Sequence, residues 1–172
     1  SVSEWEVAAV TSFSGAFEGT ALSSNAALKD EIYVSWVDVQ QNNAFATAYS
    51  DWNFAGIFLS KDELQTAVDA WIADEKTAAE THGSISGWDT SRVEDLSELF
   101  KDAPPAFNSE LAWDTSKVTT MYSTFGGATA FNSQLVWDTS SVTNMDRTFV
   151  VAEAFNRPLD WDTSKVTSML ET

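Results

Sequence analysis

The tetrapeptide Trp-Asp-Thr-Ser occurs four times in the C-terminal half of this 172-residue chain, and its spacing is the strongest constraint on the fold. The copies begin at Trp88, Trp113, Trp137 and Trp161, at intervals of 25, 24 and 24 residues. Other columns recur in register with them: a Val, then a Leu or Met, then a Phe, then Phe-Asn, and a Leu two residues before the next Trp. So many matched columns indicate a repeat protein, in which each unit buries its apolar face against its neighbours.

Apolar spacing inside one unit predicts its local structure. Leu135 and Trp137 have the two-residue spacing of a short strand with both side chains pointing inward. Val142, Met145 and Phe149 have the spacing of one face of a short helix. The period lies within the 20–29 residues of leucine-rich repeats. We therefore expect an α/β (α+β) repeat solenoid, a short leucine-rich-repeat-like array.

The pattern W-D-T-S-x-V-T-x-M-x-x-x-F, followed by A-F-N-x-x-L, resembles the BspA-like surface-protein repeat, also called the mycoplasma-type 25-residue repeat. The match covers residues 85–172. The resemblance implies structural columns related to leucine-rich repeats, and adhesion or protein interaction rather than catalysis. It carries over no catalytic, metal-binding or cofactor-binding residue.

A capping helix is predicted ahead of the repeats, over residues 60–83, with the repeats filling residues 84–172. Ser60 and Glu63 have capping-box spacing, and Gly83 is placed to end the helix. An apolar stripe at helical spacing is formed by Leu64, Ala67, Val68, Trp71 and Ile72. Such a helix would cover the first repeat. The helix and the following Gly-Ser-Ile-Ser-Gly-Trp resemble the entry to algal members of the same family.

Residues 1–59 form an irregular N-terminal segment. Residues 5–28 match the repeat spacing from Trp5 to Leu28 without the Asp-Thr-Ser corner, and they are predicted to be a decayed repeat. Residues 29–59 have no counterpart in the repeats and are rich in aromatic side chains. Six of these are candidates for a partner interface: Tyr33, Trp36, Phe45, Tyr49, Trp52 and Phe54.

Two departures from the repeat add candidates near the C-terminus. Val150 and Val151 occupy a loop position where earlier repeats have polar or small residues, namely Lys101-Asp102 and Gly126-Gly127. They would either contact a partner or tuck into a local core. The sequence stops just after Met169 and Leu170, and no capping helix follows. We expect a partner or further residues to cover that end, because open repeat ends expose apolar surface.

Composition excludes several classes of function. With 26 acidic and 9 basic side chains, the chain carries a formal charge of −17, which disfavours binding to nucleic acid or to an anionic membrane. There is no Cys and a single His, His82, so thiolate chemistry, zinc fingers and multi-His metal sites are excluded. The longest apolar run is far shorter than the ~20 residues of a membrane-spanning helix. We therefore expect no enzyme, no cofactor and no transmembrane segment.

The stacked polar columns have alternative interpretations. The Asp column (Asp89, Asp114, Asp138, Asp162) could bind calcium, but helix capping is favoured. The Thr columns (Thr115 with Thr119, Thr139 with Thr143) could order water and bind ice, but an ordinary structural role at a strand-to-helix corner is favoured. The Asn column (Asn25, Asn108, Asn132, Asn156) could face a ligand, but an internal ladder of side chains bonded to backbone groups is favoured.

The sequence therefore predicts a non-catalytic protein-interaction module. The favoured hypothesis is an accessory or docking subunit of a larger assembly, with an algal organellar or photosynthetic complex as a host. A cell-surface or secreted adhesin is the alternative. The chain begins without Met, so we expect a processed chain in a plastid or outside the cell. Residues 1–80 hold 13 acidic and 3 basic side chains, so a partner that meets this half should present a basic surface.

Overall fold

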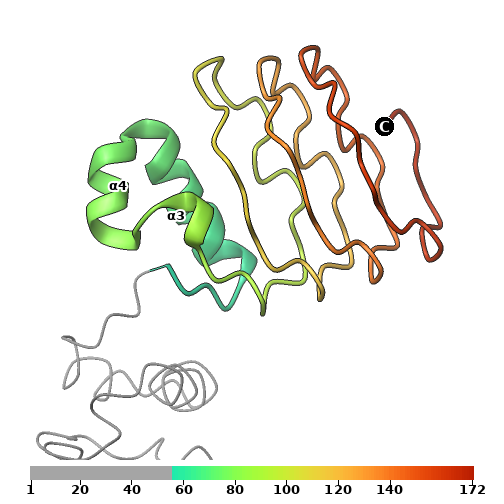
Figure 1. The fold of residues 1–172 in the computed structure, drawn as a ribbon, viewed down its shortest axis with the longest axis horizontal. Helices are drawn as coiled ribbons and strands as arrows, with labels where there is room; N and C mark the ends of the chain where they lie inside the picture. Colours follow the sequence, from blue (N-terminus) through green and yellow to red (C-terminus); the bar gives the residue numbers. More distant parts are fainter. Residues whose placement is uncertain (1–55) are drawn as a thin grey trace, which may run out of the picture. The chain divides into compact units, whose positions relative to one another are not determined.

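The computed structural model describes residues 56–172, in which two helices precede a stack of repeats. The elements are α3 (Lys61–Ala73), α4 (Glu75–His82) and the 3-10 turn η4 (Ile85–Gly87). Repeats 1 to 4 follow, at residues 88–112, 113–136, 137–160 and 161–172. The repeats lie side by side in chain order, with α3 and α4 beside repeat 1 (Figure 1). The predicted decayed repeat and aromatic stretch lie outside the described residues, apart from residues 56–59.

The single helix predicted over residues 60–83 is wrong in one respect, because the chain forms two helices that break at Asp74. Asp74 is extended (φ −156°, ψ 91°), and its carboxylate accepts a hydrogen bond from the Thr77 N–H at the start of α4. The predicted start is confirmed, since Ser60 Oγ accepts from the Glu63 N–H at 3.3 Å. Gly83 is the C-cap of α4, as predicted.

The predicted apolar stripe of α3 packs against the first repeat. Leu64 and Val68 are fully buried, and Trp71 meets Trp88 edge-on with ring centroids 5.9 Å apart. On another side of Trp88, the Phe58 ring lies 4.8 Å away. Ile57 forms a parallel bridge with Asp89, so residues 56–59 pair with repeat 1. These contacts seal the first face of the stack from water.

The strand and helix predicted inside each repeat are absent from residues 88–172, which form successive tight turns instead. Within repeat 1, for example, the Leu99 N–H donates to the Leu96 carbonyl and the Lys101 N–H to the Glu98 carbonyl. The β-bridges between adjacent repeats in residues 88–172 are isolated parallel ones, which join Asp95, Thr120, Asn144 and Ser168. The predicted inward direction is correct, because the Val, Leu or Met, and first Phe positions of repeats 1 and 2 are buried. A turn every two residues can place these side chains on one face without a helix.

Aromatic rings stack along the repeats in three columns. The Trp rings lie 6.2, 6.1 and 6.4 Å apart between centroids, with planes within 11°. The columns beginning at Phe100 and Phe107 have spacings of 5.2 to 6.0 Å. Each such pair contributes roughly 0.5–1.5 kcal/mol beyond area burial. The interfaces between repeats are therefore largely aromatic.

Threonine and asparagine side chains tie each repeat to the next. Thr90, Thr115 and Thr139 are buried, and each hydroxyl donates to the Asp carbonyl of the following repeat at 2.9 to 3.0 Å. At the surface, Asn132 N–H donates to Asn108 Oδ1 at 2.7 Å, and the Asn156 N–H bonds Asn132 in the same way. The predicted bonding of Asn side chains to backbone groups is confirmed at Asn108 and Asn132, but the predicted internal position is wrong because the ladder lies at the surface. Asn25 lies outside the described residues.

Candidate functional site

Four rows of hydrogen-bonded peptide groups run through the repeats along the direction of stacking. In the first row, the Thr120 carbonyl accepts from the Leu96 N–H at 3.1 Å. The N–H of the same peptide group, that of Met121, donates to the Asn144 carbonyl at 2.9 Å. The other rows begin at the N–H groups of Glu98, Phe100 and Asp102 and follow the same pattern. In these four rows the N–H points toward the C-terminal end of the stack and the C=O toward the N-terminal end. A fifth row runs the other way, because the N–H groups of Thr119, Thr143 and Thr167 each donate at 2.8 Å to a carbonyl of the preceding repeat.

Two columns of this backbone adopt left-handed conformations. One contains Glu98, Ser123, Arg147 and Glu171, and the other contains Asp102, Gly127 and Val151. Asp and Gly tolerate positive φ, whereas a left-handed residue with a β-branched side chain is strained by about 1–2 kcal/mol. Val151, at φ 60°, is therefore the strained member of its column. Strain of this kind occurs preferentially at functional sites.

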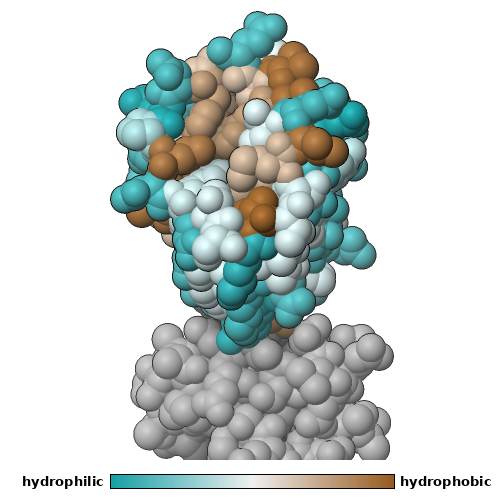
Figure 2. Space-filling model, turned by 90° about the vertical axis from the view of Figure 1, so that its right-hand side faces the viewer, coloured by the Kyte–Doolittle hydropathy of each residue, from teal (hydrophilic) through white to brown (hydrophobic). Residues whose placement is uncertain are grey.

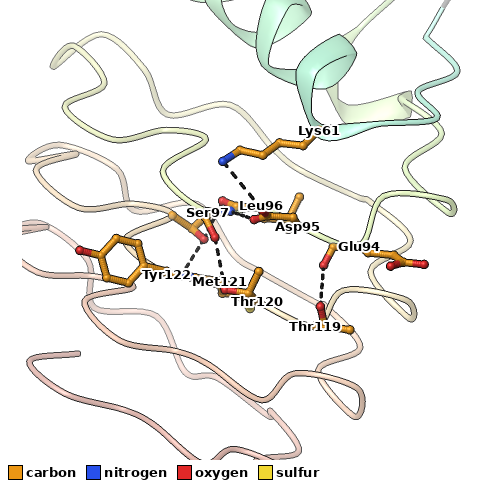
Figure 3. A network of polar contacts seen from close by, with 10 residues as sticks. Lys61, Glu94, Asp95, Leu96, Ser97, Thr119, Thr120, Met121 and Tyr122 are labelled. Atoms are coloured by element: carbon orange, nitrogen blue, oxygen red, sulfur yellow. Dashed lines mark hydrogen bonds and ion pairs between the residues drawn. The ribbon is translucent and has the colours of Figure 1, made fainter.

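At the N-terminal end of the stack, here called the capped end, α3 covers repeat 1. Gln65 Nε2 donates to the Leu99 carbonyl at 3.2 Å, which supplies a donor to one of the four rows. Lys61 Nζ lies 4.0 Å from an Asp95 carboxylate oxygen, and Asp95 also accepts from the Ser97 N–H (Figure 3). The capped end therefore brings a donor and a cation to the side where carbonyls point outward.

The opposite end, here called the open end, consists of the exposed faces of repeats 3 and 4. Within the described residues, no hydrogen bond is made by the four N–H groups that end the rows, and we call them the donor edge: Phe149, Val151, Met169 and Glu171. Apolar side chains surround this edge, and Figure 2 shows them gathered on this face. Val151 is 60% exposed, Met169 47% and Leu170 68%.

The structure separates the predicted interface residues into three groups. Val151, Met169 and Leu170 are exposed at the open end, where the Leu170 carbonyl accepts from the Arg147 N–H. Val150 is half-buried and lies against Gly126, so it is the residue that tucks inward. The six aromatic candidates lie outside the described residues: Tyr33, Trp36, Phe45, Tyr49, Trp52 and Phe54.

Sequence reasoning missed two exposed apolar residues. Leu159 is 36% exposed at the open end, although its column is buried at Leu111 and Leu135. Val136 is 86% exposed on repeat 2, one repeat removed from the open end. Val136 therefore serves as a reference for an apolar side chain outside the candidate site.

Charge differs between the two ends. Residues 61–112, which include the helices and repeat 1, contain 12 acidic and 4 basic side chains. Residues 113–172 contain 7 acidic and 4 basic side chains. The part of the chain that includes the open end therefore carries less net negative charge. A partner protein that binds there needs less positive charge on its own surface.

The Asp column closes tight turns. The carboxylates of Asp89, Asp138 and Asp162 each accept from a backbone N–H two residues later, at 2.8 to 3.0 Å. The hydroxyl and backbone N–H of Ser140 hold the pKa of Asp138 below its usual value. The predicted helix capping is wrong because no helix follows, but the carboxylates do satisfy backbone amides. Nowhere in residues 56–172 do three or more His, Asp or Glu side chains gather as a metal ion would require.

The Thr columns are occupied by hydrogen bonds within the chain. Thr115 and Thr139 are buried, so they present no hydroxyl array to solvent. Thr119 and Thr143 are exposed, and each hydroxyl donates at 3.1 Å to a carbonyl of the preceding repeat. The hydroxyl protons of this exposed column are therefore used in hydrogen bonds between repeats.

A shallow hollow of about 110 Å³ lies where the helices meet the outer loop of repeat 1. Trp71, Ile72 and Pro104 contribute to its walls. Sites for small molecules occupy about 300–1,000 Å³, so this hollow is too small for a typical ligand. The open end is the stronger candidate site.

Comparison with protein families identifies the repeats. The family model described as "Mycoplasma protein of unknown function, DUF285" matches residues 72–172, from the end of α3 through all four repeats. The chain belongs to this family. The DUF285 match confirms the BspA-like resemblance at the level of the family. No curated protein and no solved structure matches the chain. Among the described helices of this DUF285 protein, none is long and apolar enough to cross a membrane.

Proposed function

We propose that this DUF285 chain is a non-catalytic protein-interaction module whose repeats form a short solenoid related to leucine-rich repeats. The observation that carries the proposal is the apolar character of two outward positions at the open end, Val151 and Leu170. The equivalent residues elsewhere are Asp102 and Gly127 for the first position, and Ser97, Tyr122 and Asp146 for the second. An outward apolar side chain adds little to packing within the stack, and Val151 also strains the backbone. Contact with another protein gives both features a physical reason.

The proposed role is that of an accessory or docking subunit in a larger assembly. The stack would act as a rigid spacer between its acidic capped end and its apolar open end. The acidic capped end would attract a basic partner surface by charge. The apolar open end would bind an apolar partner surface by burying it. We place the chain in an algal branch of the family, with an organellar complex as host, because its entry helix resembles that of algal members.

Site-specific photo-crosslinking tests the interaction function. A photoreactive amino acid would replace Val151 in one variant and Val136 in the other, because both side chains are exposed. Each full-length chain would be incubated in extract from the native source and irradiated. We expect one discrete adduct from position 151 and none from position 136. Equal labelling at the two positions, or no adduct at either, would contradict the proposal.

A second candidate function, a cell-surface adhesin, is favoured by membership of a family that resembles surface-protein repeats. It predicts a longer precursor with many more repeats and a lipid or wall anchor. Sequencing of the full transcript separates this candidate from the accessory subunit, for which neither a long array nor an anchor is expected.

A further inference from the structure

The outer loop of repeat 1 is one residue longer than the outer loops of repeats 2 and 3. Three residues, 104–106, separate its Ala from its Phe-Asn pair, whereas the later repeats have two, 129–130 and 153–154. The added residue accounts for the 25-residue interval between the first two Trp-Asp-Thr-Ser copies. Pro104 and Ala106 of this loop line the hollow of about 110 Å³ beside the helices. The longer loop therefore forms one wall of the hollow.

The hollow combines apolar walls with oxygen acceptors. Trp71 and Phe107 contribute aromatic surface, and Ile72 contributes aliphatic surface. Glu75 and Ser109 complete the lining and bring a carboxylate and a hydroxyl to it. Trp71 Nε1 donates to Ser109 Oγ at 3.3 Å, and a hydroxyl oxygen has a second lone pair for another donor. The hollow therefore suits a side chain with an apolar stem and a hydrogen-bond donor at its tip.

The charge of this region favours a cation at that tip. Residues 61–112 contain 12 acidic and 4 basic side chains, and three of the basic ones already pair with other carboxylates of the region. Glu75 forms no ion pair within residues 56–172. A neutral apolar group against Glu75 would remove water from its charge without replacing it, whereas a cation compensates the loss. The aromatic walls add a cation–π attraction.

The size of the hollow fits the end of a single side chain. A cavity of about 150 Å³ can hold a benzene molecule. The hollow, at about 110 Å³, therefore has room for slightly less than that. A lysine side chain is a flexible, unbranched stem of four carbons with a compact ammonium, whereas arginine ends in a broad planar fork. Lysine therefore fits the hollow better than arginine does.

We infer that the hollow between the helices and the outer loop of repeat 1 binds a lysine side chain from a basic segment of a partner protein. The stem would lie against Trp71 and Phe107, and the ammonium would pair with Glu75. This contact rests on the proposed interaction function and gives the acidic capped end a specific point of recognition.

Other occupants of the hollow carry the wrong charge. Residues 1–55 of the chain contain one basic side chain, Lys29, and seven acidic ones. A second copy of the chain carries a formal charge of −17 and would be repelled by the acidic capped end. A basic segment of another protein is attracted to the same surface.

NMR titration of the full-length chain tests this contact, with the Trp71 indole N–H resonance as the reporter. The probe is the peptide acetyl-Gly-Ser-Gly-Lys-Gly-Ser-Gly-amide, and we expect it to shift this resonance saturably. A peptide with norleucine in place of Lys keeps an apolar stem without the charge. A peptide with 2,4-diaminobutyrate keeps the charge on a shorter stem. Both should bind about fivefold or more weakly, because each lacks one of the two contacts.

Two pairs of variants locate the contact. Glu75→Gln keeps the shape of the side chain and removes its charge, so it should weaken binding of the Lys peptide about threefold to fivefold. Glu80→Gln removes an equal charge from the same helix and should leave binding unchanged. Ala106→Leu should fill the hollow and abolish the shift, whereas Ala154→Leu, at the equivalent position of repeat 3, should not. All four side chains are exposed, so the fold should survive each change.

Several outcomes would overturn the lysine contact. One is a Trp71 resonance that does not move up to the solubility limit of the Lys peptide. Equal binding of the norleucine peptide would show a purely apolar contact, and equal weakening by Glu75→Gln and Glu80→Gln would show diffuse attraction. If Lys29→Ala moves the Trp71 resonance before peptide is added, the chain's own lysine occupies the hollow. If position 151 crosslinks to a native partner while the Lys peptide does not bind, the interaction function stands and the lysine contact falls.

Discussion

Trp88 at the capped end and Trp161 at the open end occupy the same column in different surroundings. Trp88 is buried between Phe58, Trp71 and Trp113. Trp161 is half-buried, and its buried Nε1 has no hydrogen-bond partner in the described structure. The inner Trp113 and Trp137 donate to the carbonyls of Ile85 and Leu111. A Trp that packs between two neighbouring rings therefore stabilises the fold more than one that packs on a single side. This is expected for a stack held together by interfaces between adjacent repeats.

Removal of a tryptophan should show the largest difference between the inside of the stack and its open end. Trp113→Ala deletes a 4%-exposed ring between two stacked rings and should lower the free energy of unfolding by about 3–5 kcal/mol. Trp161→Ala removes a ring that stacks on one side only, and it should cost roughly half as much. Urea denaturation followed by circular dichroism gives both values. Equal losses would show that the open end is packed as tightly as the interior.

The buried Thr hydroxyls that join each repeat to the next should contribute less to stability than the Trp rings. Thr139→Val replaces the buried hydroxyl that donates to the Asp162 carbonyl at 2.9 Å, and it should cost about 1–2 kcal/mol. Thr163, the next member of the column, is exposed, and its hydroxyl forms no hydrogen bond within residues 56–172. Thr163→Val is therefore the matched control and should change thermal stability little. A similar loss in both variants would assign the effect to side-chain shape rather than to the hydrogen bond.

Val151→Gly should stabilise the chain, in contrast to the two preceding changes. The substitution relieves a left-handed β-branched residue, worth about 1–2 kcal/mol, and adds backbone entropy to the unfolded state, worth about 0.5–1 kcal/mol. A net gain of about 0.5–1 kcal/mol is expected in urea denaturation. Val136→Gly, at an exposed site without positive φ, should only destabilise. If both variants lose stability equally, Val151 is unstrained.

Acid should loosen the contact between repeats 3 and 4. Asp146 Oδ1 accepts from Ser168 Oγ and from the Leu170 N–H, both at 2.6 Å, and so ties repeat 4 to repeat 3. The Ser168 hydroxyl, followed by the Leu170 N–H, lowers the pKa of Asp146. A lowered folded-state pKa stabilises the fold above the unfolded value of about 3.9, and this stabilisation is lost as pH falls toward the folded pKa.

The melting temperature between about pH 6 and pH 2 measures this linkage. Asp146→Asn should flatten the acid side of the profile. Asp160→Asn, which removes an equal charge from an exposed residue of the same repeat, should leave that slope in place. If the melting temperature falls with pH equally in both variants, Asp146 does not cause the loss of stability in acid.

Much of the packing was predictable, because it depends on side-chain spacing alone. The buried columns and the caps at Ser60 and Gly83 all follow from residue type and period. The break at Asp74 was not predicted, although an Asp followed three residues later by Thr77 is an N-cap signal inside a long helical pattern. The start signal at Ser60 and the stop signal at Gly83 fit one helix as well as two, and this concealed the boundary.

The turn-based backbone of the repeats was beyond sequence reasoning for a physical reason. Apolar residues at positions i, i+3 and i+7 fit a helix, but they also fit turns that occur every two residues. The choice depends on peptide groups bonding to the next repeat, which is a tertiary contact. Positive φ at Glu98 and Arg147 also has no signal in those side chains. At the candidate site, Val151 was predicted from its chemistry, whereas the donor edge required the backbone.

The position of the cap has a consequence for the order of folding. Contacts between repeats join residues about 24 apart, so each repeat can fold as soon as the one before it is in place. Synthesis proceeds from the N-terminus, and α3 and α4 leave the ribosome before repeat 1. The apolar face of α3 is therefore synthesised before the first Trp-Asp-Thr-Ser unit that packs against it. Each completed repeat is then the template for its successor, so the stack grows in a fixed direction, away from α3 and α4.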